Sequence, residues 1–260
     1  MTGRKHGKAP YSIVVAHGGP GAAGSVKPLC EELGKTHGVL EPFQTEMTVR
    51  GQMDELRRVI ETDADAPVIL IGHSWGAMLC FMFAATYPTL VKKLILISSG
   101  MLEEVEQETM QKNRERNLTP EEKTELASLR ATFANPQEED MDDVFRRFGR
   151  LMDNVDSYRP LDIDVDDSHY RYAVYASIWS EAHAMRKRGE MMAMGERIAC
   201  DVVAIHGDQD PHPADAVKAS LEKVIANPRF YKLKDCGHTP WKERDAQDAF
   251  YAILTKELSG

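Results

Sequence analysis

Residues 67–86 read PVILIGHSWGAMLCFMFAAT, and they carry the clearest structural signal in the chain. A short apolar run at the start predicts a buried strand, and the long apolar run at the end predicts a helix enclosed in the core. Between them lies a G-x-S-x-G motif at residues 72–76. Glycines two residues before and after the serine let the strand and helix approach closely. The motif therefore predicts a tight strand-to-helix turn with Ser74 at its tip.

A serine at such a turn is suited to act as a nucleophile. Its hydroxyl would project above the sheet at the N-terminus of the following helix, where the helix dipole favours developing negative charge. The motif alone is common by chance, because glycine and serine are frequent residues. The predicted strand before it and helix after it are the features that favour catalysis.

A glycine-rich segment, HGGPG at residues 17–21, follows the first apolar strand, which we predict at residues 11–16. In a hydrolase, backbone N–H groups of this loop would form an oxyanion hole. We expect the N–H groups of Gly19 and Trp75 to face the developing oxyanion. The other interpretation is a glycine-rich turn with a conformational role only.

The same loop permits a function of another class. Residues 19–24, GPGAAG, satisfy the G-x-G-x-x-G pattern between a strand and a helix, and Glu41 lies about where a ribose-binding carboxylate would be expected. A dinucleotide-binding protein is therefore an alternative. It leaves unexplained the turn at Ser74 and the two polar segments that follow the last strands.

These two polar segments are HGDQD at residues 206–210 and DCGH at residues 235–238. Because the carboxyl ends of parallel strands lie at one edge of a sheet, Asp210 and His238 can meet Ser74 there. Serine, acid and histidine also occur in the order expected for such a triad. Each residue in isolation could be an ordinary surface residue, so it is the ordered set that indicates catalysis.

The three side chains would divide the chemistry between them. His238 would remove the Ser74 proton, the serine would attack a carbonyl carbon, and Asp210 would orient the imidazole and stabilise its cation. Asp208 is the alternative acid. The alternation of histidine and aspartate over residues 206–212 also resembles metal ligands, but no second cluster completes the set. We therefore expect no metal and no other cofactor.

A charged insertion divides the strand–helix pattern into two parts. Residues 1–100 and 197–260 alternate strands with helices, which predicts a mostly parallel, doubly wound α/β sheet. Residues 101–196 are strongly charged and helical, with a capping box at residues 119–122 and an amphipathic pattern over residues 140–155. The sequence therefore predicts an α/β core from the two flanking parts and a helical cap from the insertion.

Composition limits the partners of the protein. The chain has 260 residues, enough for one large α/β domain, and a formal net charge of −9 at pH 7. This charge disfavours binding to nucleic acid or to an anionic membrane surface. The sequence predicts no transmembrane helix and no signal peptide, and its four widely spaced cysteines are typical of a reduced, cytoplasmic protein. We expect a small molecule or short peptide as substrate.

The motifs together resemble those of the α/β-hydrolase superfamily. HGGPG, GHSWG, IHGDQD and CGHTPW carry the resemblance, which is nearest to the proline iminopeptidase-like branch, serine peptidase family S33. The resemblance implies an α/β-hydrolase fold, a helical cap over the active site and an acyl-enzyme mechanism. In iminopeptidases, cap carboxylates bind the free amino group of the substrate, which makes Glu181 a candidate for that role. Its other interpretation is a solvated helix charge.

Three departures from that branch keep other activities open. Ten residues precede the first strong strand, so we expect a truncated N-terminus and a sheet of about six strands. The D-x-x-G-x-G-x-S turn of iminopeptidases is missing at residues 40–45, and His73 before the serine is more typical of esterases. A carboxylesterase, a lactonase and a carbon–carbon bond hydrolase therefore remain alternatives on the same triad. A non-catalytic ligand receptor on this scaffold is a further one.

Overall fold

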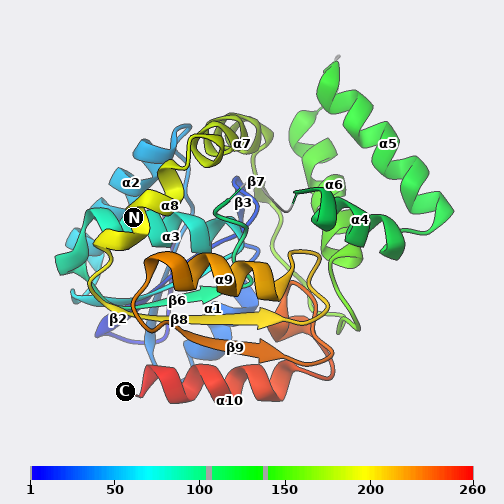
Figure 1. Ribbon diagram of the computed structural model, residues 1–260. Helices are drawn as coiled ribbons and strands as arrows, with labels where there is room; N and C mark the ends of the chain where they lie inside the picture. Colours follow the sequence, from blue (N-terminus) through cyan, green and yellow to red (C-terminus); the bar gives the residue numbers. More distant parts are fainter. Residues whose placement is uncertain (1, 104–106, 137–139, 260) are drawn as a thin grey trace.

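A seven-stranded sheet forms the centre of the protein (Figure 1), in a computed structural model that describes residues 2–103, 107–136 and 140–259. From one edge to the other, the strands are β1 (Gly3–His6), β4 (Gly38–Pro42), β2 (Tyr11–Ala16), β5 (Val68–His73), β6 (Val91–Ile97), β8 (Asp201–Gly207) and β9 (Arg229–Leu233). β1 is antiparallel to β4, and every other neighbouring pair is parallel. The mostly parallel sheet predicted from the sequence is confirmed.

The prediction of about six strands is corrected to seven. The strand that the apolar patterns do not reveal is β1, whose residues read GRKH. An edge strand is hydrogen-bonded on one side only and stays largely solvated, so it needs no apolar alternation. β1 extends the sheet beyond β4 and places polar side chains at this edge.

Helices cover both faces of the sheet. One face carries α2 (Val49–Asp63), α3 (Trp75–Thr86) and α9 (Ala214–Val224). The other carries α1 (Lys27–Leu33) and α10 (Gln247–Leu258). Along β2, Val14 packs into the first of these apolar layers and Ile13 into the second, because successive side chains of a strand point to opposite faces. In α3 every residue from Trp75 to Ala85 is buried, which explains why its sequence is apolar all round.

The segment between β6 and β8 is mainly helical. Its described helices are α4 (Gln107–Asn117), α5 (Pro120–Ala134), α6 (Met141–Val155), α7 (Tyr172–Lys187) and the short α8 (Glu190–Met194). α4, α5 and α6 lie beyond the carboxyl ends of the strands, whereas α7 lies across α2 and α3 (Figure 1). α7 and α8 contribute to the apolar core around α3, while α5 and α6 enclose a separate small cluster.

Residues 156–171, which we call the strap, connect α6 to α7. At its end, β7 (His169–Tyr170) pairs antiparallel with β3 (Ala22–Ala23), which belongs to the glycine-rich loop after β2. The strap therefore joins the inserted helices to the core. Among the described helices, none has both the length and the apolar character to cross a lipid bilayer.

Candidate active site

The turn between β5 and α3 has the geometry of a strained strand-to-helix connection. Ser74 caps the N-terminus of α3 with φ 54° and ψ −116°, a conformation that costs of order 1–3 kcal/mol in non-glycine residues. The flanking glycines are needed because backbones approach there. A Cβ atom on Gly72 would lie 2.3 Å from the carbonyl oxygen of Gly76, and one on Gly76 would lie 2.3 Å from that of Ala16.

The glycine-rich loop after β2 lies directly against this turn. A Cβ atom on Gly18 would lie 3.0 Å from the Cβ atom of Ser74. The next residue, Gly19, has φ 42°, a conformation that glycine adopts without strain. Trp75 is the first residue of α3, so its N–H has no partner within the helix. Gly19 and Trp75 are thus the residues that follow Gly18 and Ser74 at this contact, and their role as oxyanion donors stays a prediction.

His17 supports this loop from inside the core. Its imidazole is fully buried between two backbone carbonyl oxygens, those of Gly18 and Phe43, each 2.9 Å from a ring nitrogen. Burial lowers the pKa of His17 despite these carbonyl contacts, so the ring is neutral at pH 7 and donates to one carbonyl at a time. The local sequence around His17 does not indicate this role, because Phe43 is 26 positions away.

The structure brings Asp210 and His238 together from the loops after β8 and β9. His238 Nδ1 lies 2.8 Å from Asp210 Oδ2, and both residues are buried. Asp208, the alternative acid, is exposed, and its carboxylate accepts a long hydrogen bond of 3.4 Å from the backbone N–H of Cys236. Of the two carboxylates, only that of Asp210 contacts the imidazole.

Asp210 is surrounded by three imidazole rings. Besides His238, Nδ1 of His212 lies 2.9 Å from Oδ1, and Nε2 of His206 lies 3.3 Å from Oδ2. Burial would raise the pKa of Asp210, but its attraction to His238, His206 and His212 outweighs burial and holds the pKa well below 3.8. Asp210 is therefore a carboxylate at neutral pH, as an acid that stabilises an imidazolium must be.

The environment of His238 favours its charged form. Burial alone would lower the pKa, but the charge of Asp210 and its hydrogen bond outweigh burial, with a smaller contribution from Asp156, and the pKa is raised above 6.5. Arg114 acts in the opposite direction. A base with a raised pKa accepts a proton readily, which is the property required of His238 in the predicted triad.

His73, beside the serine, has the opposite character. Burial and the charge of His238 lower the pKa of His73 to about 3, so its ring is neutral. Its Nε2 lies 2.9 Å from the backbone oxygen of His238 and must donate, because a carbonyl only accepts. Its Nδ1 is buried and has no hydrogen-bond partner among the described residues. His73 thus fixes the backbone that carries the candidate base.

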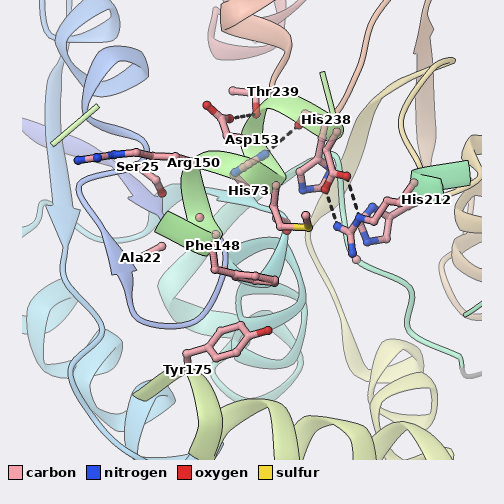
Figure 2. Close-up of a pocket in the computed structure, with 18 of the residues that line it drawn as sticks. Ala22, Ser25, His73, Phe148, Arg150, Asp153, Tyr175, His212, His238 and Thr239 are labelled. Carbon is pink, nitrogen blue, oxygen red and sulfur yellow. Dashed lines mark hydrogen bonds and ion pairs between the residues drawn. The ribbon is translucent and has the colours of Figure 1, made fainter. Parts of the chain in front are cut away.

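Ser74 and His238 line one cavity of about 460 Å³ between the core and the inserted helices, together with Gly18 and Gly19. The cap supplies six aromatic side chains to the lining: Phe133, Phe145, Phe148, Tyr170, Tyr175 and Trp179. In Figure 2 the rings of Phe148 and Tyr175 face the interior of the pocket, and His73, His212 and His238 lie at one side. No hydrogen bond joins the Ser74 hydroxyl to His238 within the described part of the chain. Catalytic hydrogen bonds are often long without substrate and shorten when it binds.

Carboxylates in the cavity wall are mostly neutralised by cations. Asp156 forms two contacts with Arg114, of 2.7 and 2.5 Å. The other two ion pairs are Asp153 with Lys242 and Asp167 with Arg150. The remaining carboxylate of the lining, Glu115, is exposed to solvent. The described wall therefore offers no buried carboxylate without a cationic partner.

Glu181 does not lie where the sequence-based hypothesis required. It is not among the residues that line the cavity, and its Oε2 accepts a hydrogen bond of 2.8 Å from the backbone N–H of Val49, the first residue of α2. The carboxylate caps a helix N-terminus here, so substrate binding by Glu181 stays a prediction that the described cavity does not support. The direction of a side chain on an amphipathic cap helix depends on tertiary packing, so the sequence pattern alone does not place it.

The glycine pattern at residues 19–24 is also explained without a dinucleotide. A Cβ atom on Gly21 would lie 2.4 Å from the backbone oxygen of Arg171, and one on Gly24 would lie 2.1 Å from that of Asp166. These glycines therefore admit the backbone of the strap. Glu41, the candidate ribose ligand, is fully buried and lies 2.9 Å from Nε2 of His6.

Among the residues that the structure describes, two groups of side chains have ligand atoms close enough to share one cation. They are His6, Cys30 and Glu41 at the β1 edge, and Asp210, His212 and His238 in the cavity. In both groups a carboxylate already accepts hydrogen bonds from imidazole, and these bonds account for the arrangement. Neither group gives a reason to invoke a metal.

Comparison with known proteins identifies the family. A model of the α/β-hydrolase fold matches residues 20–245, which is most of the chain, and the protein belongs to this family of hydrolases. The predicted fold class is thereby confirmed. The narrower resemblance to the iminopeptidase branch is not confirmed.

The relatives found are distant. Cis-3-alkyl-4-alkyloxetan-2-one decarboxylase of Shewanella oneidensis is 24% identical over 102 residues, 34% of this chain and 32% of that protein. The chain thus matches about a third of that relative's length. An enol-lactonase structure from Burkholderia xenovorans has a TM-score of 0.63 at 20% identity, covering 99% of this chain and 95% of that one. The 2-hydroxy-6-oxo-6-phenylhexa-2,4-dienoate hydrolase of Rhodococcus sp. strain RHA1 has a TM-score of 0.63 at 18% identity, covering 98% and 92%. At these identities, the likeness of the two structures concerns the fold.

Proposed function

We propose that this protein is a serine hydrolase that cleaves carboxylic esters, open-chain or cyclic, through an acyl-enzyme. The observation that carries the proposal is the hydrogen bond between buried Asp210 and His238 beside a cavity that the strained Ser74 also lines. A carboxylate, an imidazole and a hydroxyl so disposed can activate the hydroxyl as a nucleophile.

The reaction would proceed in two halves. His238 takes the proton of Ser74 as the hydroxyl attacks the ester carbonyl, and the backbone N–H groups of Gly19 and Trp75 donate to the oxyanion. When the tetrahedral intermediate collapses, His238 gives this proton to the departing alcohol. Water then attacks the acyl-serine with His238 again as base, which releases the carboxylic acid and restores the hydroxyl. Asp210 holds the imidazole and stabilises its cation in both halves.

The lining of the cavity favours an uncharged, apolar substrate over an aminoacyl one. Six aromatic side chains of the cap line the cavity that Ser74 also lines, and they gain free energy by burying apolar groups. An aminopeptidase would need a carboxylate free to bind the substrate's ammonium group, whereas three of the four carboxylates in the described lining, including the buried Asp156, are already paired with Arg or Lys. The Shewanella protein is named an oxetan-2-one decarboxylase and the Burkholderia protein an enol-lactonase, and each name refers to a cyclic ester.

Two measurements test the proposal. A fluorophosphonate should modify wild-type protein stoichiometrically at Ser74, and Ser74→Ala should abolish the modification while the protein stays folded. A substrate panel should then show hydrolysis of aryl esters and lactones of increasing apolar size, and little of proline or leucine arylamides. Folded wild-type protein that resists the fluorophosphonate would rule out an activated serine. A preference for arylamides with a free amino group would restore the aminopeptidase alternative.

A further inference from the structure

The strap, residues 156–171, contacts the His238 loop at its first residues. The backbone N–H of His238 donates to the carbonyl oxygen of Asp156 at 2.9 Å. A Cβ atom on the preceding residue, Gly237, would lie 2.5 Å from this same oxygen, so the two backbones are in direct contact. The position of the candidate base therefore depends on a segment that belongs to the inserted region.

Glu243 stabilises this contact between the strap and the His238 loop through hydrogen bonds to both segments. Its Oε1 accepts hydrogen bonds from the backbone N–H groups of Tyr158, at 2.8 Å, and Gly237, at 2.9 Å. Its Oε2 accepts one from the N–H of Arg159, at 2.8 Å. One carboxylate thus bonds two residues of the strap and the residue immediately before His238.

Such a carboxylate is unusual because it is fully buried. A buried ionised group is costly unless hydrogen bonds or an opposite charge compensate for the lost water. The ion pairs formed by the described residues do not include Glu243, so the compensation comes from its three backbone donors. Apolar packing could hold the two segments together at a lower cost in free energy. The directional hydrogen bonds to the Glu243 carboxylate oxygens therefore indicate that the strap and the His238 loop are held in one fixed relative position.

At its other end the strap contacts the glycine-rich loop after β2, which carries Gly19. The backbone N–H of Arg171 donates to the carbonyl oxygen of Gly21 at 2.8 Å, and β7 pairs with β3 in the residues that follow Gly19. Asp166 also forms an ion pair with Arg4 of β1. One segment of 16 residues therefore touches both the loop of the candidate base and the loop of the candidate oxyanion donors.

We propose that Glu243 is a positioning residue, which fixes the strap to the His238 loop so that base and oxyanion donors keep one relative geometry. The inference rests on the triad proposed above. Glu243 acts through backbone groups and contacts no reacting atom. Its removal should misplace His238 while leaving the apolar substrate cavity intact, and so lower kcat more than it raises KM.

Glu243→Gln tests this proposal in the full-length protein. Glutamine has the same shape, but its amide nitrogen would face a backbone N–H donor in place of an acceptor. With 4-nitrophenyl butyrate we expect kcat to fall about 10- to 100-fold, because a displacement of about 1 Å at a catalytic group can cost 10²-fold, with KM within about twofold of wild type. As control, Asp245→Asn removes the negative charge from an exposed ion pair of 2.7 Å with Arg159 on the same strap and should leave both constants unchanged.

The pH profile separates positioning from a general loss of folded protein. The hydrogen bond to Asp210 raises the pKa of His238, so a loosened loop should move the acid limb of kcat/KM to lower pH. The other titratable or charged groups that act on His238 are Asp156, Arg114 and three imidazoles, those of His73, His206 and His212. Glu243→Gln replaces none of them. A purely structural role would reduce the amplitude of the profile without shifting it.

Gly237→Ala provides a second route to the same displacement. The added Cβ would lie 2.4 Å from Glu243 Oε1 and 2.5 Å from the Asp156 oxygen, so it should push the strap away while Glu243 remains. We expect the same fall in kcat and the same shift of the acid limb. Folded variants with wild-type kcat and pH profile would overturn the proposal. Fluorophosphonate labelling distinguishes failure of this proposal from failure of the proposed function. Wild-type protein that is not labelled would contradict the proposed function. Wild type and Glu243→Gln that are labelled at equal rates would contradict only the positioning role of Glu243.

Discussion

At the scale of single residues, the candidate site consists of histidines with contrasting environments. His73 has its pKa lowered to about 3 by burial and the neighbouring charge of His238, while the pKa of His238 is raised because Asp210 outweighs burial. One ring therefore stays a neutral hydrogen-bond donor to the backbone, and the other can gain and lose a proton near neutral pH. The division arises from the carboxylate, which contacts His238 and not His73.

The raised pKa of His238 gives a prediction with a definite sign. Only the neutral ring can accept the serine proton, so kcat/KM should fall about tenfold per pH unit on the acid side of a midpoint above 6.5. Asp210→Asn removes the attraction that outweighs burial, and the midpoint should move below 6.5 while kcat falls about 10³- to 10⁴-fold. Initial rates between pH 4 and pH 9 on an aryl ester measure both. A wild-type rate that is flat down to about pH 4 would contradict the role of His238 as base.

At the scale of elements, the sequence was most informative where local pattern and function coincide. β5, the turn at Ser74 and α3 were predictable because an apolar strand, two close-approach glycines and an apolar helix occupy adjacent residues. The strand ends predicted that Asp210 and His238 can lie near Ser74, because each of these residues follows a strand of the same parallel sheet. β1 was missed because an edge strand carries no apolar alternation, and the number of strands was underestimated for that reason.

Interactions between distant segments could not be predicted in this way. Glu243 and Tyr158 are 85 positions apart, and His73 and the His238 backbone are 165 apart. Nothing in the local sequence of a buried polar residue indicates which backbone groups it will meet. The same reason explains why the sequence pattern did not reveal that the Glu181 carboxylate caps α2.

The capping role of Glu181 leads to a prediction about α2 and α7. Glu181→Ala should lower the free energy of unfolding by about 1 kcal/mol, because one charge-assisted hydrogen bond to the Val49 N–H is lost at a partly exposed site. It should leave the ratio of activities on aryl esters and aminoacyl arylamides unchanged. Urea denaturation and the two assays measure these quantities, and Glu190→Ala, which removes an exposed ion pair on α8, serves as control. A selective loss of activity on aminoacyl substrates would return Glu181 to the substrate-binding groups.

At the scale of the whole molecule, one ion pair within the inserted region lies next to both core loops that carry the candidate acid and base. Arg114 of α4 binds Asp156 at the start of the strap, and the carbonyl oxygen of Asp156 accepts the N–H of His238. Asn113 adds a hydrogen bond of 3.0 Å from α4 to the carbonyl oxygen of Pro211, next to Asp210. The cap therefore holds both loops that carry the candidate acid and base, and a change at α4 should be felt in stability and in acid–base behaviour.

Arg114→Met measures this connection. The variant leaves the Asp156 carboxylate, whose side chain is 6% exposed, without its cation, and the free energy of unfolding should fall by about 2–3 kcal/mol. This estimate lies below that for a fully buried pair because the guanidinium is 22% exposed. Since Arg114 opposes protonation of His238, its removal should also move the acid limb of kcat/KM to higher pH.

The double variant Arg114→Met, Asp156→Asn decides whether the effect belongs to the pair. Removing both charges leaves no unpaired buried carboxylate, so most of the lost stability should return. The acid limb should move back toward the wild-type position, because Arg114 lowers and Asp156 raises the pKa of His238. Arg150→Met breaks an ion pair whose arginine is 67% exposed, and it should cost less than about 1 kcal/mol. Urea denaturation of wild type, Arg114→Met, Asp156→Asn and the double variant gives the coupling free energy between the two side chains. Arg150→Met is measured beside them as the control. A value near zero would mean that α4 and the strap are held together by other contacts, and that the cap reaches His238 without this ion pair.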